Sequence, residues 1–163
     1  MSTVKWNGRN LLKTIAENEA AATRLYRVIA SEARIGEQFF ELLAHDEERH
    51  EKIYAALFNK FSEKMDLELE KSDAEYVDLL VENNVLFDDE LVEKAKKIFS
   101  KSQIFDLAEK AERDAILFVN ELQRLYPDLA KEEMAIILKE EQAHLKKVLE
   151  RKKESQPMFG RGM

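Results

Sequence analysis

The chain has 163 residues, enough for one domain with a substantial buried core, and a formal net charge of −7. It contains no Cys, only 4 Gly and 2 Pro, and is rich in Ala, Leu, Glu and Lys. This composition excludes disulfides and thiolate metal sites and favours long helices, and its interspersed charges differ from the basic face typical of a nucleic-acid-binding protein. We therefore expect an all-α protein without a nucleic-acid partner.

Helical periodicity predicts four long helices. They extend over about 10–32, 37–61, 102–126 and 131–152, with breaks at Ile35-Gly36 and at Pro127. Connections this short make the helices of each consecutive pair antiparallel. The predicted architecture is a four-helix bundle made of two antiparallel pairs.

The segment from about 62 to 101 joins these pairs. Ser72 and Glu75 have the spacing of a capping box, and Asp88-Asp89 predict the start of a short helix that ends near Phe99. We expect a long crossover that contains one or two short helices.

The first ten residues, MSTVKWNGRN, do not combine a basic segment with an apolar run, so we expect no secretory signal. No apolar stretch approaches the roughly 20 residues that span a bilayer. We expect a soluble, cytoplasmic protein without a membrane partner.

We also expect a single bundle domain over 1–153 and a flexible tail over 154–163, whose Phe159 could dock on the bundle.

Each long helix has an apolar face, read at alternating spacings of three and four, that is interrupted by charge in its middle. The first and third helices have a lone Glu there, and the second and fourth have a Glu-x-x-His pair. The interrupting residues are Glu19, Glu47, His50, Glu112, Glu141 and His144. The two halves of the chain repeat this pattern at nearly equal separations, so the bundle should bring these side chains to one level.

Four carboxylates in an apolar interior are costly and repel one another. Protonation or pairing with the two imidazoles relieves part of this cost, whereas two divalent cations balance all four charges. Oxygen and nitrogen ligands without sulfur suit iron or manganese. A single Glu-x-x-His is commonly just a solvated helix face, but six such residues in two matched halves favour a metal site. His45 lies off this face, and we expect it at the surface.

These motifs resemble the ferritin-like di-iron carboxylate proteins, and within them the rubrerythrin family. The resemblance is carried by Glu19 with Tyr26, Glu47-Glu48-Arg49-His50, Glu112 followed by Asp114-Ala115-Ile116-Leu117-Phe118, and Glu141-Gln142-Ala143-His144. It implies a ferritin-like bundle that binds two metal ions, iron or manganese, through the six residues named above. It also implies that Glu47 and Glu141 bridge the metals and that Glu19 and Glu112 are terminal ligands.

The chain departs from the family pattern in two places. Rubrerythrins proper usually carry a Cys-rich rubredoxin domain, and this chain has no Cys, so electrons should come from a separate partner. The family's extra Glu on the third helix is replaced by Ala115, while Glu109 lies one turn before Glu112 and is expected to be solvated or paired with a lysine. Ala115 makes the site resemble a ferroxidase or simple oxidase more than a full rubrerythrin peroxidase.

Tyr26 lies on the apolar face two turns after Glu19, and its counterpart in the second half is Val119. In one interpretation its hydroxyl binds a ligand carboxylate, and Tyr26 contributes to catalysis through that ligand. Alternatively, Tyr26 is a core aromatic whose hydroxyl is satisfied elsewhere. The sequence does not separate these alternatives.

Three functions fit these patterns. The favoured one is a di-iron or di-manganese oxidoreductase that reduces hydrogen peroxide or dioxygen in oxidative-stress defence. The second is a ferroxidase or iron-handling protein, and the third is a metal-stabilised binding module. A homodimer is expected from the family resemblance and from Phe39, Phe58 and Phe61, which could exceed what one bundle covers.

Overall fold

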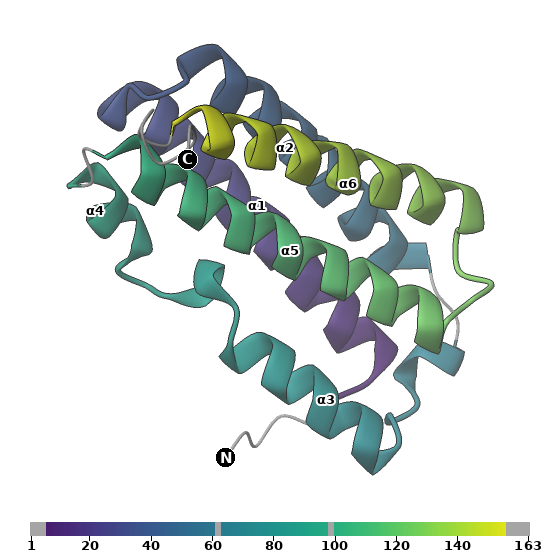
Figure 1. Cartoon of the computed structure of the whole chain (residues 1–163). Coiled ribbons are helices and arrows are strands. Elements are labelled where there is room, and N and C mark those ends of the chain that lie inside the picture. The colour runs from purple at the N-terminus through teal and green to yellow at the C-terminus, as the bar shows by residue number, and fades with distance from the viewer. Residues whose placement is uncertain (1–5, 61–62, 98–99, 156–163) are drawn as a thin grey trace.

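The computed structural model describes residues 6–60, 63–97 and 100–155, and these residues form a helical bundle (Figure 1). Its long helices are α1 (Gly8–Val28), α2 (Glu37–Lys60), α5 (Lys101–Leu125) and α6 (Lys131–Glu154). The described residues include no strand, only an isolated bridge between Asn7 and Glu68. None of the helices described is both long and apolar enough to cross a membrane. The predicted all-α class is confirmed.

The first helix pair is delimited by local backbone features. The Asn7 side chain caps α1 by accepting a hydrogen bond from the Asn10 backbone N–H at 2.8 Å. At its other end α1 continues as a π-helical turn, η1 (Ile29–Ala33). Arg34 and Gly36 then adopt left-handed conformations, with φ of 55° and 57°. Because the chain reverses within so few residues, α1 and α2 lie antiparallel and in extensive contact.

The second pair, α5 and α6, is built similarly. The Ser100 hydroxyl caps α5, and α5 ends at Leu125, shortly before Pro127. Ala130, with a left-handed φ of 42°, directly precedes α6. Helix α6 continues to Glu154, slightly beyond its predicted end. Residues 156–163 of the predicted tail, including Phe159, lie outside the described residues.

The crossover contains short helical segments, as predicted: η2 (Glu63–Asp66), α3 (Lys71–Glu82), η3 (Val85–Phe87) and α4 (Leu91–Lys96). The predicted capping box is wrong, because α3 begins at Lys71 and Ser72 already lies inside the helix. A tertiary contact positions this start, since the Leu69 backbone N–H donates to the Trp6 carbonyl at 2.9 Å. Asp88 does organise the start of α4 by accepting from the Glu90 backbone N–H at 2.9 Å. The predicted helix end near Phe99 lies outside the described residues.

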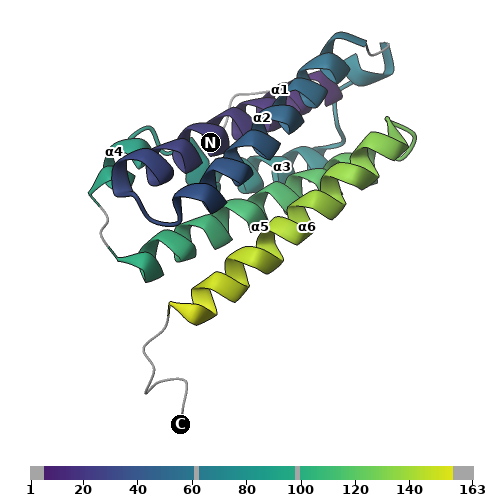
Figure 2. The same ribbon diagram turned by 90° about the horizontal axis from the view of Figure 1, so that it is seen from above.

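The crossover runs along the bundle from the start of α1, where η2 packs, to its end, where α4 packs (Figures 1 and 2). Side-chain hydrogen bonds attach it to the bundle. The Trp6 indole N–H donates to Asp78 at 2.6 Å, and the buried Asn84 amide donates to Asn18 at 2.9 Å. The connection therefore forms part of the folded domain.

Two apolar clusters fill the bundle, one toward each end. One is rich in aromatic rings and includes Tyr26, Phe39, Phe40 and Phe105. The other includes Leu12, Ile15, Tyr54, Phe118 and Ile137. Between the clusters lie the charged residues that interrupt the apolar faces, so a polar layer divides the core.

Phe39 does not provide the exposed apolar surface that was expected to support a dimer. Only 7% of it is exposed, because it packs against Phe40 and Phe105 and beneath the Arg151 guanidinium, 4.4 Å from the ring centroid. Phe58 is half-buried and packs against the core. Phe61 lies outside the described residues.

Candidate metal centre

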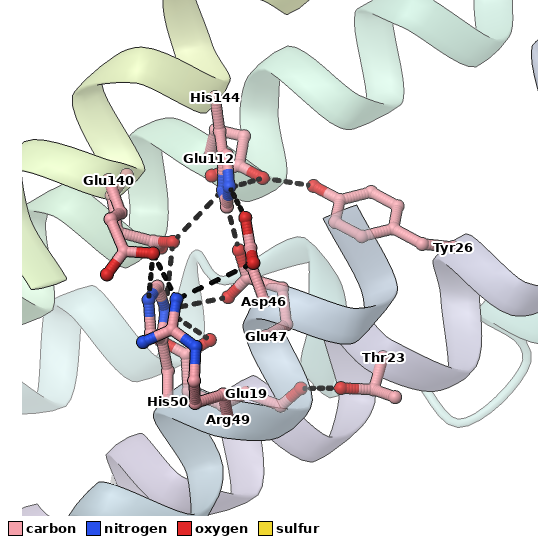
Figure 3. A network of polar contacts seen from close by, with 11 residues as sticks. Glu19, Thr23, Tyr26, Asp46, Glu47, Arg49, His50, Glu112, Glu140 and His144 are labelled. Atoms are coloured by element: carbon pink, nitrogen blue, oxygen red, sulfur yellow. Dashed lines mark hydrogen bonds and ion pairs between the residues drawn. The ribbon is translucent and has the colours of Figure 1, made fainter. Parts of the chain in front are cut away.

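Six carboxylate and imidazole side chains meet in the middle of the bundle, contributed by all four long helices (Figure 3). Each is at most 5% exposed: Glu19, Glu47, His50, Glu112, Glu141 and His144. The three-residue spacing within each Glu-x-x-His pair points both side chains inward from one helix face. The structure thus brings together all the residues predicted as metal ligands.

These residues form two overlapping groups in which the candidate ligand atoms lie within 4.8 Å of one another. One group consists of Glu19, Glu47, His50 and Glu141, and the other of Glu47, Glu112, Glu141 and His144. Only Glu47 and Glu141 belong to both groups. Their shared position is the one expected of bridging carboxylates, and Glu19 and Glu112 lie where terminal ligands are expected.

Both imidazoles direct Nδ1 toward the carboxylates. His50 Nδ1 lies 3.2 Å from Glu141 Oε1, and His144 Nδ1 lies 3.0 Å from Glu47 Oε1. The rings are nearly parallel, with centroids 6.2 Å apart. His50 Nδ1 therefore faces the group that contains Glu19, and His144 Nδ1 faces the group that contains Glu112.

Many polar atoms of this layer lack a hydrogen-bond partner among the described residues. They include Glu19 Oε2, Glu47 Oε2, Glu112 Oε2, both carboxylate oxygens of Glu141 and both ring nitrogens of His50. Unsatisfied buried polar atoms are costly, and native interiors contain few of them. Four carboxylates carry the charge that two divalent cations balance, and the oxygen and nitrogen donors suit iron or manganese. The residues therefore fit a pair of divalent metal ions.

Without metal, burial raises the pKa values of Glu19 and Glu141 well above the ordinary range, and the neighbouring charge of Glu47 adds to both shifts. Burial and Glu47 likewise raise the pKa of Glu112 to about 7. Burial also acts to raise the pKa of Glu47, but polar contacts with the surrounding carboxyl and imidazole groups, among them the hydrogen bond with His144, outweigh it and lower that pKa well below its usual value.

The imidazoles shift in the direction that favours their charged form. Burial alone would lower the pKa of His50, but its contacts with Glu141 and Glu47 prevail and raise it to about 10. The pKa of His144 is raised for the same reason by Glu112, Glu141 and Glu47. Protons thus stabilise the metal-free cluster, and metal ions must displace them.

A carboxylate lies behind each imidazole, and it comes from the opposite Glu-x-x-His helix. Asp46, directly before Glu47 on α2, has Oδ2 2.8 Å from His144 Nε2 (Figure 3). Such an interaction fixes the ring orientation and raises its basicity as a ligand. Asp46 therefore holds His144 with Nδ1 directed into the cluster.

The equivalent contact at His50 is not formed. Glu140, directly before Glu141 on α6, has Oε2 3.7 Å from His50 Nε2, too long for a hydrogen bond. Its carboxylate instead pairs with the Arg49 guanidinium, which also lies 3.5 Å from Asp46. Arg49 thus connects the two outer carboxylates and makes the surroundings of the two histidines unequal.

Tyr26 makes the hydrogen bond that was one of its two predicted alternatives. Its hydroxyl donates to Glu112 Oε1 at 2.8 Å, and the side chain is fully buried. Burial and the Glu112 charge raise its pKa well above the ordinary value, so it stays a donor. Val119, its counterpart, is a buried apolar residue.

A model of the Rubrerythrin family matches residues 10–152, nearly the whole described bundle. The chain belongs to the rubrerythrin family. A crystal structure from Thermotoga maritima, described as a ferritin-like diiron-carboxylate protein, superposes with a TM-score of 0.76. The two sequences are 21% identical, and the match covers 95% of this chain and 100% of the Thermotoga maritima chain. The likeness therefore shows a shared ferritin-like fold. No curated protein matches the chain. Together with the buried cluster, the family indicates a carboxylate–histidine site for two metal ions.

The structure also places three further positions that the sequence analysis discussed, His45, Glu109 and Ala115. His45 is exposed on α2, as expected. Glu109 pairs with Lys152 at 2.9 Å and with Arg113, which confirms its predicted surface pairing and removes it from the centre. Ala115 is buried and adds no ligand to this rubrerythrin-family site.

Sequence reasoning missed the outer carboxylates, Arg49 and the environment of Tyr54. A signal for the carboxylates was present, since an acidic residue directly precedes the Glu of both Glu-x-x-His pairs. Helical periodicity places Asp46 and Glu140 beside the apolar face, where each is also consistent with a solvated residue. Only the approach of α2 to α6 shows that Asp46 reaches His144, while Glu140 stays 3.7 Å from His50.

Proposed function

We propose that this rubrerythrin-family chain is a di-iron, or alternatively di-manganese, oxidoreductase that reduces hydrogen peroxide or dioxygen in oxidative-stress defence. The observation that supports it most is the pair of overlapping four-residue groups whose donor atoms lack other partners within the described chain. Glu19, Glu47, His50, Glu112, Glu141 and His144 would hold the metals, which when bound would supply the two electrons that cleavage of an O–O bond consumes.

The surrounding residues have separate tasks in this proposal. The apolar clusters on either side keep bulk water from the layer, which strengthens its electrostatic interactions and limits side reactions. Asp46 orients His144, and the Tyr26 hydroxyl holds Glu112 in place. Tyr26 is therefore proposed as a positioning residue.

The electrons must reach the site from elsewhere. With no Cys, the chain contains no thiolate-bound iron centre. We propose a separate electron donor. The predicted homodimer and cytoplasmic location stay predictions, which gel filtration and fractionation of the producing cells would test.

Ferroxidase or iron-handling activity is the second candidate, favoured by Ala115. An Ala at this position leaves a nearly symmetric set of six residues, with one terminal Glu on each side. The third candidate, a metal-stabilised binding module, requires that the ions only stabilise the bundle. A dry charged layer is a poor way to stabilise a fold that apolar side chains would stabilise directly.

Stopped-flow oxidation of the anaerobically Fe(II)-loaded protein separates these functions. We expect hydrogen peroxide to oxidise the loaded iron faster than dioxygen does. Faster oxidation by dioxygen, with ferric iron accumulating over repeated additions, would favour the ferroxidase. If the loaded iron reacts with neither oxidant, the metal-stabilised binding module would be the remaining candidate.

A matched pair of histidine variants controls this experiment. His50→Ala should lose mainly one of the two irons and with it the rapid oxidation, whereas the exposed His45→Ala should retain both irons and the oxidation rate. Equal iron content and oxidation rate in the two variants would contradict the assignment of His50 as a ligand.

A further inference from the structure

Tyr54 on α2 is a second tyrosine associated with the buried layer, and its hydroxyl is unusual. The side chain is fully buried, yet the hydroxyl has no hydrogen-bond partner within the described part of the chain. Buried tyrosine hydroxyls normally find a partner, because an unsatisfied one loses its hydration without compensation. The Tyr26 hydroxyl, by contrast, is satisfied by Glu112.

The position of Tyr54 directs its ring toward the centre. It lies four residues after His50, one turn further along the same face of α2. Side chains on a helix lean toward its N-terminus, so the phenol leans back over the turn that carries His50. Its ring belongs to the apolar cluster of Leu12 and Ile15, on the opposite side of the polar layer from the cluster of Tyr26. The two tyrosines thus flank the layer from opposite ends.

The charges of the buried carboxylates act on the Tyr54 hydroxyl. After burial, Glu19, Glu141 and Glu47 are the causes that raise its pKa well above the ordinary value. A hydroxyl in this environment stays protonated and remains a hydrogen-bond donor.

More unsatisfied atoms belong to this half of the centre than to the other. Among residues that belong to one half alone, Glu19 Oε2 and both nitrogens of His50 have no hydrogen-bond partner among the residues described, whereas the other half has only Glu112 Oε2. In the other half, Tyr26 binds Glu112 and Asp46 binds His144. A donor beside incompletely satisfied ligands is suited to binding a small molecule that also contacts the metals.

We propose that the Tyr54 hydroxyl donates a hydrogen bond to a small oxygen or nitrogen ligand, such as water, a peroxide or azide, bound in the Glu19–His50 half of the loaded centre. This inference rests on the proposed function, because it requires bound metals with room for such a ligand. Tyr54 would contact the substrate directly, whereas Tyr26 acts through Glu112.

Azide titration of the iron-loaded, oxidised protein tests the proposal. Tyr54→Phe removes only the hydroxyl, so its iron content should equal that of the wild type. Its azide affinity, followed by visible absorption, should fall roughly tenfold, since the lost hydrogen bond is to a charged ligand. Unchanged azide affinity in Tyr54→Phe would overturn the proposal.

The stability of the metal-free protein gives an independent readout. Because the Tyr54 hydroxyl has no partner within the described chain, Tyr54→Phe should leave the metal-free protein at least as stable as the wild type in urea. A lower urea midpoint for Tyr54→Phe than for the wild type would reveal a protein partner for the hydroxyl and overturn the proposal. Tyr76→Phe, on α3 with the side chain 42% exposed, is the matched control and should change neither readout.

Failure of this inference is distinguishable from failure of the proposed function. If the wild type retains no iron, both the oxidoreductase proposal and the ligand site fall. If the wild type retains iron and binds azide, and Tyr54→Phe binds azide equally well, only the role of Tyr54 is wrong.

Discussion

The two halves of the centre contain the same types of candidate ligand at the same helical spacing, but their surroundings differ. In the α5–α6 half, Glu112 accepts a hydrogen bond from Tyr26, and His144 contacts Asp46, both at 2.8 Å. In the α1–α2 half, Glu19 Oε2 and both nitrogens of His50 have no such partner in the described part of the chain. The internal repeat therefore includes the candidate ligands but not the side chains that contact them.

This difference indicates a division of labour between the halves. Ligands held by outer hydrogen bonds are preorganised and bind metal at a lower entropic cost. We therefore expect the half with His144 to bind metal more tightly and the half with His50 to be more open to small ligands. The following predictions test this contrast.

The largest effect should come from a carboxylate that both halves share. Glu141→Ala removes an oxygen donor from both groups, so metal content measured by elemental analysis should fall from two ions per chain to almost none. A metal whose free concentration is a hundred times its dissociation constant stabilises the folded state by about 2.7 kcal/mol. The variant should lose this stabilisation. Its melting temperature should therefore differ from the wild type much more with metal than without.

The single-half variants and a surface control complete this test. His50→Ala and His144→Ala should each lose mainly one ion, and Glu109→Ala, at a surface ion pair with Lys152, should lose none. Full metal retention in Glu141→Ala and His50→Ala would contradict the proposed ligand set.

Asp46→Asn should weaken metal binding in the His144 half by roughly 10- to 100-fold, because the outer carboxylate orients the imidazole. Glu140→Gln should have a smaller effect, since Glu140 pairs with Arg49 rather than with His50. Anaerobic calorimetric titration with Fe(II) or Mn(II) would resolve the two affinities. Equal losses in the two variants would show that the halves are not organised differently.

The metal-free and metal-loaded proteins should respond oppositely to pH. Folding raises the pKa of Glu112 to about 7 and that of His50 to about 10, so over these ranges the folded state binds more protons than the unfolded state. Metal-free stability should therefore fall as pH rises from about 4.5, first through the Glu112 range and then from about 6.5 to 10. Metal affinity should rise over the same interval, because the ligands must lose these protons.

Urea unfolding at several pH values, with and without metal, would test this prediction. If the stability of the metal-free protein increased between pH 5 and pH 9, the folded state would not bind more protons than the unfolded state, and the prediction would be wrong. Asp46→Asn provides a useful comparison, since it alters the outer contact of His144 and leaves Glu112 and His50 in place.

Tyr26→Phe should produce the smallest change, because it removes one hydrogen bond from one carboxylate. Metal content should stay intact, metal-free stability should fall by about 1 kcal/mol, and the oxidation rate in stopped flow should change. An unchanged oxidation rate would leave Tyr26 with a packing role alone. In metal-free stability this variant should contrast with Tyr54→Phe, whose hydroxyl is unsatisfied.

The sequence by itself determined the all-α class, the two helix pairs and the meeting of the six buried charged residues. This was possible because helical periodicity is local, so charges in the middle of four apolar faces must meet wherever those faces pack. Val119 was recognisable in the same way as a departure from the repeat, at the position that corresponds to Tyr26.

Only the tertiary structure decided the features that depend on contacts between distant segments. The start of α3 follows the Leu69–Trp6 hydrogen bond rather than a local capping box, and Phe39 is buried because α5 and the end of α6 cover it. Asp46 and Glu140 have unequal roles because the Arg49 side chain extends from α2 to pair with Glu140 on α6. The last outcome follows from a difference of less than one ångström between two contact distances, 2.8 and 3.7 Å, which periodicity along one helix does not specify.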